Sequence, residues 1–185
     1  MMKEFLDIVD EKGQPTGETI DRETAHAKGI LHRTSHVWIT RKKEGKVQIL
    51  LQKRAEHKSS FPGCYDISSA GHIPAGDSYE VSALRELEEE LGVSVKEEEL
   101  IFCGDRKVIW DAVFFGKEFH DRQISRVFLL WLDKEESEFT AQESEVDSVC
   151  WIDFDECYTG VKNGLFENCI VLEELDMIRE FFSKK

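Results

Sequence analysis

Residues 71–93 read GHIPAGDSYEVSALRELEEELGV, and this segment constrains the fold more than any other part of the chain. Its leucines recur with helical spacing, at about 100° per residue, so they form a stripe that can be buried in a core. Glu86, Glu89 and Glu90 fall together on another face, because positions i, i+3 and i+4 are neighbours on a helix surface. The segment therefore predicts a helix that buries one side and presents three carboxylates on a separate polar face.

The three clustered carboxylates need a physical reason, since like charges at this spacing repel each other and destabilise an isolated helix. A solvated acidic face is one explanation. A hard divalent cation is the other, because magnesium prefers a few carboxylate oxygens, keeps several waters and shares its shell with substrate phosphates. Glu88 lies on the far side of the helix, away from this cluster.

The framing residues decide between these explanations, because the segment resembles the Nudix box, G-x5-E-x7-R-E-U-x-E-E-x-G-U, in which U is aliphatic. One position departs from that pattern, since Asp77 stands where the family has glutamate. Asp77 followed by Glu80 also predicts an N-cap and a capping box for the helix. The matching residues are Gly71, Arg85, Glu86, Leu87, Glu89, Glu90, Gly92 and Val93.

Length and composition predict one compact domain over residues 1–185. A content of 41% hydrophobic and 34% charged residues is typical of a globular protein and not of a disordered one. The net charge of −14 argues against binding to nucleic acid or to an anionic membrane. An anionic phosphate substrate must therefore be held by local cations and bound metal.

Cysteine usage and hydropathy predict the compartment. The five cysteines are odd in number and form no CxxC pair, which favours reduced thiols over a disulfide or zinc framework. The sequence shows no signal peptide, and its longest apolar stretch is Val127–Leu132. We therefore expect a cytoplasmic protein that does not insert into a membrane.

Hydrophobic periodicity and turn residues predict strands mixed with three helices. After a turn at Gly13–Gly17, Asp21 can cap a short helix that continues through Lys28 and ends at Gly29. The carboxylate-bearing segment is the second helix, and Val171–Phe182 has the periodicity of a third. The resemblance implies an α+β Nudix fold, an α/β/α sandwich with a central mixed sheet. Strands are expected at Phe5–Val9, Ser35–Thr40, Val47–Gln52, Tyr65–Ser69, Leu100–Trp110, Gln123–Leu132 and Ser148–Ile152.

Further segments resemble type I isopentenyl-diphosphate isomerase and its hydrolase cousins within the same family. The isomerase has a cysteine directly before Gly-His or Ser-His, whereas Ala70 stands here and cannot transfer a proton. Two metal-linked glutamates of the isomerase fall on Asp121 and Gln123, and an amide cannot serve as a base. This chain also keeps the Glu-Glu part of the box whole, so the residues favour hydrolysis. The similar segments are Leu6–Asp10, Ala25–His26, Leu31–Arg33, Leu50–Arg54, Lys58, Pro62–Gly63 and Gly71–His72.

The resemblance assigns metal binding and chemistry to the box. It implies that Glu86, Glu89 and Glu90 bind Mg²⁺, with Mn²⁺ as a possible substitute. Arg85 is expected to fix a box glutamate through a salt bridge, and Gly71 to let the backbone pass close to the site. The general base is left open, and its candidates are Glu86, Glu143 and Glu145.

Substrate contacts also follow from the resemblance. Arg54 and Lys58 match basic residues that contact diphosphate in the isomerase, so both are expected to bind substrate. His26, His32 and His72 match histidines that bind a metal there. Two interpretations of them stay open, a second metal site or ordinary hydrogen-bonded histidines, and we favour the latter.

The leading functional prediction is a Mg²⁺-dependent pyrophosphohydrolase that cleaves the diphosphate linkage of a nucleoside diphosphate derivative or of another organic diphosphate. The alternatives are an isopentenyl-diphosphate isomerase-like enzyme and a Nudix-like domain that binds without catalysis. The expected partner is a small-molecule diphosphate, and a homodimer is possible because related proteins often dimerise. Nothing in the sequence separates nucleotide sugars, dinucleotides, thiamine diphosphate and isoprenoid diphosphates as substrates.

Overall fold

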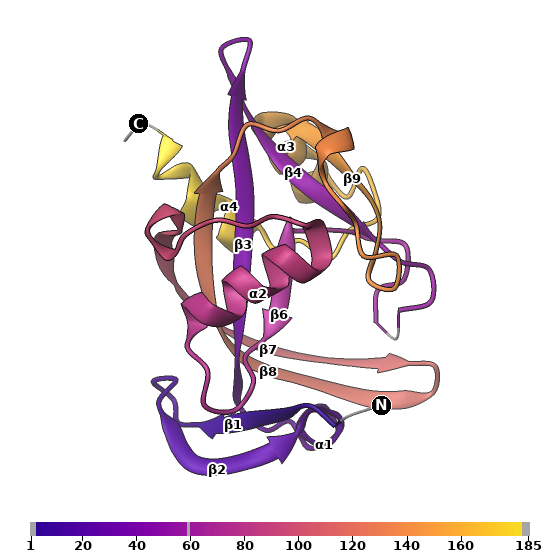
Figure 1. Ribbon diagram of the computed structural model, residues 1–185. Helices are drawn as coiled ribbons and strands as arrows, with labels where there is room; N and C mark the ends of the chain where they lie inside the picture. The colour runs from indigo at the N-terminus through magenta and orange to yellow at the C-terminus, as the bar shows by residue number, and fades with distance from the viewer. Residues whose placement is uncertain (1–2, 59, 183–185) are drawn as a thin grey trace.

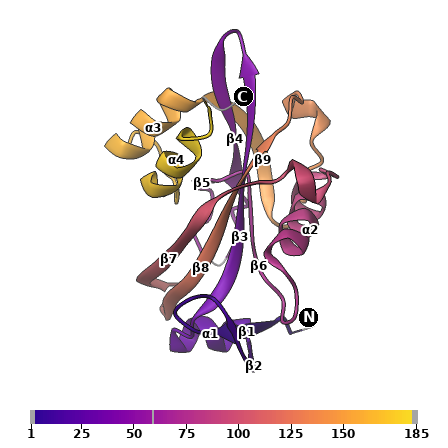
Figure 2. The same cartoon turned by 90° about the vertical axis from the view of Figure 1, so that its left-hand side faces the viewer.

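A seven-stranded mixed β-sheet forms the centre of the computed structural model, which describes residues 3–58 and 60–182. Helix α2 (Tyr79–Leu91) covers one side of this sheet, and α3 (Phe154–Asn163) and α4 (Leu172–Arg179) cover the other (Figures 1 and 2). These layers confirm the predicted α+β sandwich. The strands of the sheet are β3 (His32–Lys43), β4 (Lys46–Arg54), β5 (Tyr65–Asp66), β6 (Ser69–His72), β7 (Ile101–Phe114), β8 (Lys117–Trp131) and β9 (Val146–Asp153).

Strand β3 is the central strand and fixes the positions of the others. It pairs in parallel with β8, from His32 opposite Gln123 to Thr40 opposite Trp131. Its other edge is shared, because residues 34–37 pair with β6 and the end of the strand pairs with β4. The strand order is β5-β4-β3-β8-β7, with β6 attached to β3 and β9 attached to β4. The strand predicted at residues 65–69 is therefore divided, and its two halves belong to different partners.

The N-terminal part of the chain forms a small unit at one end of the sheet (Figure 1). Strand β1 (Phe5–Val9) pairs with β2 (Pro15–Asp21), and α1 (Arg22–Lys28) follows directly. The side chain of Asp21 accepts from the backbone N–H of Thr24, and Gly29 ends the helix at φ 63°, which confirms the predicted helix. The predicted turn at residues 13–17 is wrong after Gln14, because β2 begins at Pro15, a strand start where proline is tolerated.

Helix α2 begins one residue later than predicted. Ser78 is the N-cap, and its hydroxyl accepts from the backbone N–H of Val81 at 3.2 Å. The predicted cap at Asp77 is therefore wrong, and the carbonyl of that residue instead accepts from Arg33 at 3.1 Å. Gly92 ends the helix at φ 63° and donates to the carbonyl of Glu88, as the stop signal predicts.

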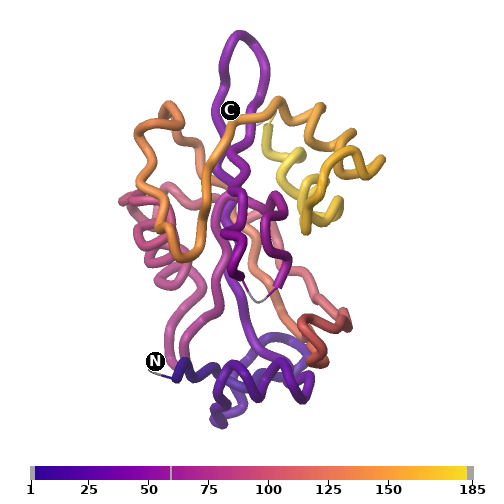
Figure 3. Tube along the Cα trace, turned by 90° about the vertical axis from the view of Figure 1, so that its right-hand side faces the viewer, coloured from indigo at the N-terminus to yellow at the C-terminus, as the bar shows by residue number. Residues whose placement is uncertain are grey.

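Two apolar cores are present. They lie on opposite sides of the sheet, one under α2 and one under α3 and α4, and Figure 3 shows these helices on the two sides. On one side Leu87 and Leu91 of α2 pack with Val37 of β3, so the predicted leucine stripe is buried. On the other side Trp38 packs with Leu175 of α4. Burying a side chain of this size stabilises the fold by about 1.5–3 kcal/mol. The alternation of neighbouring residues along β3 therefore anchors both helical layers.

The C-terminal layer contains two helices, of which the sequence analysis predicts only one. Helix α4 confirms the helix expected over residues 171–182, in a shorter form. Helix α3 is additional, and its buried residues Phe154, Cys157 and Gly160 recur at intervals of three. No helix within the described residues is long and apolar enough to cross a membrane.

Candidate active site

Helix α2 presents its three carboxylates in three different environments. Glu90 is only 6% exposed, and its Oε2 accepts from the hydroxyl of Ser69 on β6 at 2.8 Å. Glu86 is partly buried, whereas Glu89 is exposed to solvent. The carboxylates predicted to share a face therefore run from the buried side of the helix to its solvent edge.

Arg85 joins two of these carboxylates. Its Nη2 donates to Glu86 Oε1 at 2.8 Å, and its Nη1 donates to Glu89 Oε2 at 2.9 Å. The same guanidinium lies 3.5 Å from the carbonyl oxygen of His72. Because a guanidinium is planar and rigid, this arrangement restricts the rotamers of both glutamates. The geometry matches the salt bridge that the sequence predicts for Arg85.

The backbone of β6 passes directly beside Glu86. A Cβ placed on Gly71 would lie 2.2 Å from the carboxyl carbon of Glu86, a distance that real side chains do not reach. Gly71 therefore permits this approach, as its place in the sequence predicts. Since side chains alternate along a strand, Ser69 and Gly71 face α2 while Ala70 and His72 face the opposite side of the sheet.

The buried carboxylates have unfavourable electrostatics. Burial raises the pKa of Glu86, although Arg85 acts in the opposite direction. Burial also raises the pKa of Glu90 to about 8, and repulsion by Glu86 adds to this effect. Two adjacent desolvated carboxylates with raised pKa values fit a divalent cation, which would offset the cost of ionising both. The donor set at Glu86 and Glu90, with Glu89 at the solvent edge, therefore suits a hard divalent cation.

Arg54 and Lys58 lie in the same region, and each already has a carboxylate partner. Arg54 donates to Asp66 at 2.9 Å and to the carbonyl of Ser60 at 3.1 Å. Lys58 forms an ion pair with Glu145. The charges of Asp66 and Glu145 contribute to the raised pKa of Glu90, so these pairs lie close to the carboxylate site. To bind a diphosphate, either cation must exchange its carboxylate partner for phosphate.

The candidate bases of the loop before β9 are placed differently. Glu145 is half-buried, and its backbone carbonyl accepts from the N–H of Ala55 at 3.0 Å. Glu143 is exposed. The fold therefore brings Glu145 into the neighbourhood of α2 and leaves Glu143 at the surface.

A cluster of three histidines lies on the side of β6 opposite to α2. One ring nitrogen from each of His26, His32 and His72 lies within 4.8 Å of the others. Burial lowers the pKa of all three, to about 3 for His26, so the rings are neutral near pH 7. The Nε2 atoms of His26 and His72 are 3.0 Å apart and form a hydrogen bond. This bond fits the interpretation that the sequence analysis favours, in which the histidines are hydrogen-bonded.

Other polar atoms of this histidine cluster lack hydrogen-bond partners. The Nδ1 of His26 and the Nε2 of His32 are buried without one, as is Oδ1 of Asp121, 3.9 Å from His26. Burial also raises the pKa of Asp121 to about 6. Buried polar atoms are normally satisfied, so unpaired imidazole nitrogens around a carboxylate fit a bound divalent ion. This observation favours the metal interpretation over simple hydrogen-bonded histidines.

An aromatic cluster extends from these histidines along the β7–β8 hairpin. Phe119 stacks on His26 with a centroid distance of 4.3 Å, and Phe114 contacts Phe119 edge to face. Trp110 and Phe61 stack on each other at 5.1 Å. These rings form an apolar wall beside the histidine cluster.

The structure also places residues that the sequence reading missed. Ser69 donates a hydrogen bond to Glu90, and Asp66 accepts one from Arg54, but neither residue belongs to the matched box pattern. Ser69 lies two residues before Gly71 on the same face of a strand, and that alternation is a usable signal. Asp66 is paired through tertiary folding, which no local pattern reports.

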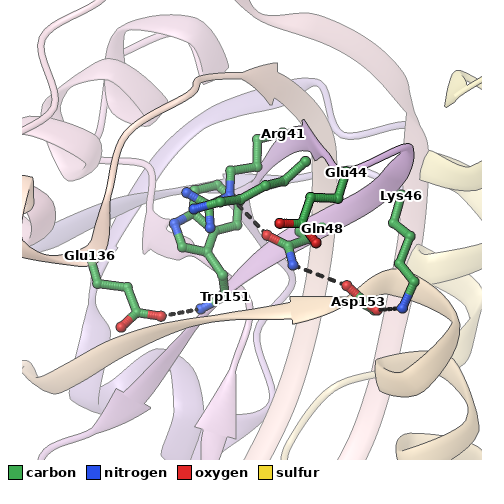
Figure 4. A pocket seen from close by; sticks show the side chains of 8 residues that line it. Arg41, Glu44, Lys46, Gln48, Glu136, Trp151 and Asp153 are labelled. Atoms are coloured by element: carbon green, nitrogen blue, oxygen red, sulfur yellow. Dashed lines mark hydrogen bonds and ion pairs between the residues drawn. The ribbon is translucent and has the colours of Figure 1, made fainter.

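A separate polar pocket lies at the hairpin end of β3 and β4 (Figure 4). Its basic residues are already paired, since Lys46 contacts Asp153 and Arg41 contacts Glu135 at 3.4 Å. The ring of Trp151 lies against the Arg41 guanidinium at 4.3 Å. The pocket holds none of the clustered carboxylates or histidines, so the candidate active site is the region of α2 and β6.

Comparison with known sequences gives consistent matches. The profile of the NUDIX domain matches residues 30–167. An uncharacterized Nudix hydrolase of Clostridium acetobutylicum is 36% identical over 178 residues, which cover 94% of this chain and 84% of the relative. Nudix hydrolase 3 of Arabidopsis thaliana is 41% identical over 159 residues, but these cover 84% of this chain and only 20% of the plant protein.

Solved structures show the same fold. DR0079 from Deinococcus radiodurans superposes with a TM-score of 0.67 at 19% identity, covering 95% of this chain and 98% of that protein. The NUDIX domain of NrtR from Shewanella oneidensis, complexed with ADP ribose, gives a TM-score of 0.59 at 15% identity, covering 80% of this chain and 86% of that protein. At this level of identity the likeness concerns the arrangement of the chain alone.

Proposed function

Since this chain belongs to the Nudix hydrolase family, whose members act on phosphorus-containing anhydrides, we propose that it is a Mg²⁺-dependent pyrophosphohydrolase of an organic diphosphate. The observation that carries the proposal is the contact between β6 and α2. Gly71 leaves room for the carboxylate of Glu86, Arg85 orients that carboxylate, and Glu90 is buried beside it. A pair of buried carboxylates at this position suits metal-assisted hydrolysis.

The proposed metal ligands are Glu86, Glu89 and Glu90. When bound there, Mg²⁺ would neutralise part of the diphosphate charge and lower the pKa of an attacking water. Arg85 holds Glu86 and Glu89 in one orientation, so the ligands need little rearrangement when the ion binds. Ser69 performs the same task for Glu90.

For the general base we propose Glu145, with Glu86 as the alternative. Glu145 is half-buried, and its charge acts on Glu90, whereas Glu143 is exposed. In this scheme Glu145 takes a proton from water, and the water oxygen bonds to one phosphorus. The bond from that phosphorus to the bridging oxygen breaks, and the bridging oxygen leaves with its electron pair as part of the second phosphate. The ion pair with Lys58 orients the Glu145 carboxylate before substrate binds.

We propose that Arg54 and Lys58 bind the diphosphate of the substrate. Both are anchored near α2 by carboxylates, and a diphosphate offers the same kind of oxygen acceptor with more charge. The leaving group is proposed to be a nucleoside or another organic group, and the ADP ribose seen in NrtR makes that compound a reasonable first substrate to test. A possible homodimer remains a prediction. The five free cysteines support a cytoplasmic location.

We also propose a second divalent-ion site at His26, His32 and His72, with Asp121 as a further ligand. The buried nitrogens and the carboxylate oxygen without partners support it. The metal content of protein equilibrated with Zn²⁺ or Mn²⁺ and then desalted tests this site. His32→Gln should lose about one bound ion per chain, while His120→Gln on the β7–β8 hairpin should lose none. If both variants keep the metal content of the unaltered protein, the three histidines do not bind a metal and have a structural role.

Isomerisation is disfavoured as the activity of this site. Ala70 carries no proton-transfer group, and the amide oxygen of Gln123 accepts a hydrogen bond from Thr34 at 3.2 Å. A panel of diphosphates assayed for phosphate or nucleotide release with Mg²⁺ and with Mn²⁺ tests the proposed function. Metal-dependent cleavage of at least one compound is expected. Absence of any cleavage, with binding of diphosphate retained, would instead support the non-catalytic alternative.

A further inference from the structure

The loop between β6 and α2, residues 73–78, is held by the N-terminal hairpin. The backbone N–H of Ala75 donates to the carbonyl of Phe5 at 2.8 Å, and that of Gly76 donates to Asp7 Oδ2 at 3.0 Å. Leu6 forms an isolated bridge with Pro74. In Figure 1 this loop descends from β6 to β1 before the chain turns back into α2. Strand β1 therefore binds the loop that sets where α2 begins.

One buried ion pair joins the hairpin, the central sheet and this loop. Arg33 of β3 is 8% exposed and Asp7 of β1 is 9% exposed, and Arg33 Nη2 donates to Asp7 Oδ2 at 2.9 Å. The same Nη2 donates to the carbonyl of Asp77 at 3.1 Å, and the carbonyl of Arg33 accepts from the N–H of Ile73. The pair thus contacts both ends of the loop.

A second contact fixes the first residue of α2. Two guanidinium groups lie over the ring of Tyr79, that of Arg33 at 5.3 Å from the ring centroid and that of Arg126 at 4.2 Å. The turn of the N-terminal hairpin also reaches this ring, because a Cβ on Gly13 would lie 3.2 Å from the Tyr79 hydroxyl. Cation–π contacts of this kind are directional, so they favour one placement of the helix start.

We infer that Asp7 and Arg33 are positioning residues for metal binding by α2. They hold residues 73–78 and the first turn of the helix, and the same helix carries Glu86 and Glu90 to their places beside β6. The family match begins at residue 30, so the hairpin supplies this support from outside the matched segment. The inference rests on the proposed function, since it concerns the same metal-binding carboxylates.

The expected effect follows from helix rigidity. A shift or rotation at Tyr79 is transmitted along α2 to the carboxylates. Misplacement of a catalytic group by about 1 Å lowers the reaction rate about 10²-fold. Asp7→Asn keeps the size of the side chain and one oxygen acceptor but removes the charge that faces Arg33. We therefore expect the metal dissociation constant of this variant to rise about 10- to 100-fold.

The experiment measures Mn²⁺ binding to the full chain by electron paramagnetic resonance, together with the Mg²⁺ concentration that gives half-maximal hydrolysis. Asp10→Asn is the matched control, because Asp10 caps the exposed turn of the same hairpin through the N–H groups of Lys12 and Gln14. Asp7→Asn should weaken metal binding while KM at saturating metal changes less. Asp10→Asn should behave like the unaltered protein.

Two outcomes would overturn the inference. One is equal metal affinity in Asp7→Asn and Asp10→Asn, and the other is a lower melting temperature of Asp7→Asn without any change in metal affinity. If Asp7→Asn does not fold, Arg33→Lys replaces it, because lysine keeps the charge but cannot reproduce the geometry of the guanidinium. Arg33→Lys with unaltered metal affinity would overturn the inference equally. Loss of activity in Glu86→Gln alongside a neutral Asp7→Asn would leave the proposed function intact.

Discussion

Gly71→Ala tests whether the close approach of β6 to Glu86 sets the geometry of the active site. The new Cβ would lie 2.2 Å from both the carboxyl carbon and Oε1 of Glu86, whereas ordinary contacts begin at 3.4 Å. Glu86 must therefore retreat by roughly 1 Å or more. The φ angle of Gly71 is not positive, so alanine adds no backbone strain and the effect is steric.

The magnitude of this effect follows from the required displacement. A shift of about 1 Å in a reacting or metal-binding group lowers the rate by about 10²-fold, which is roughly 3 kcal/mol in the barrier. Overpacking of this kind also destabilises a fold by about 1–3 kcal/mol. We therefore expect Gly71→Ala to lower the Mg²⁺-dependent kcat about 100-fold while the protein remains folded.

The assay compares kcat and the free energy of unfolding for the unaltered protein, Gly71→Ala and the double variant Gly71→Ala/Glu86→Ala. The double variant should regain stability, because the shorter side chain at position 86 removes the steric conflict. It should remain inactive, because the carboxylate is absent. A Gly71→Ala variant that keeps kcat within a factor of about three would refute the reasoning.

The remaining predictions concern substrate binding, stability and the excluded reaction. Arg54→Ala should lower kcat/KM about 10- to 150-fold, with a smaller loss for Lys58→Ala, because a guanidinium grips phosphate with two hydrogen bonds. Unchanged kcat/KM in both variants would mean that these cations serve only their carboxylate partners. Burial alone would raise the pKa of Glu174, but His36, Arg106 and Trp38 outweigh it and hold the value at about 2. The unfolded chain therefore binds the extra proton between about pH 4.5 and pH 2, and stability falls as pH falls through this window. Denaturation at several pH values should show that Glu174→Gln loses this part of the slope, together with about 3–5 kcal/mol at pH 7. If Glu174→Gln keeps the same dependence of stability on pH in this window, Glu174 is not the group that causes it. Isopentenyl diphosphate should show no double-bond migration, and deuterium uptake at its allylic carbons would overturn that expectation.

Local signals in the sequence predict α2 well. The leucine spacing, the carboxylate cluster and the stop at Gly92 all belong to one continuous segment, so no distant contact is needed to interpret them. The helix start was predicted less well, because Asp77 and Ser78 are both good caps by residue type. The choice between them depends on Arg33, which binds the carbonyl of Asp77 from a strand distant in sequence.

The rest of the site depends on pairings that sequence patterns do not report. Ser69 reaches Glu90 only because β6 pairs with β3 beneath α2. Arg54 and Lys58 were predicted by resemblance to bind phosphate, but their carboxylate partners come from other segments. Helix α3 has a short apolar pattern directly after β9, and a pattern of that length is ambiguous between helix and strand.

The central claim is that the carboxylates on one face of α2 bind the metal that supports hydrolysis. Mg²⁺-dependent turnover of the best diphosphate substrate tests it most directly, measured for Glu89→Gln, Glu90→Gln and Glu88→Gln. Glu88 is exposed on the far side of the same helix and provides the matched control. We predict that Glu89→Gln and Glu90→Gln lose turnover on the order of 10³-fold while both proteins remain folded. Glu88→Gln should keep the turnover of the unaltered protein. Equal turnover in all three variants at saturating substrate would contradict the claim.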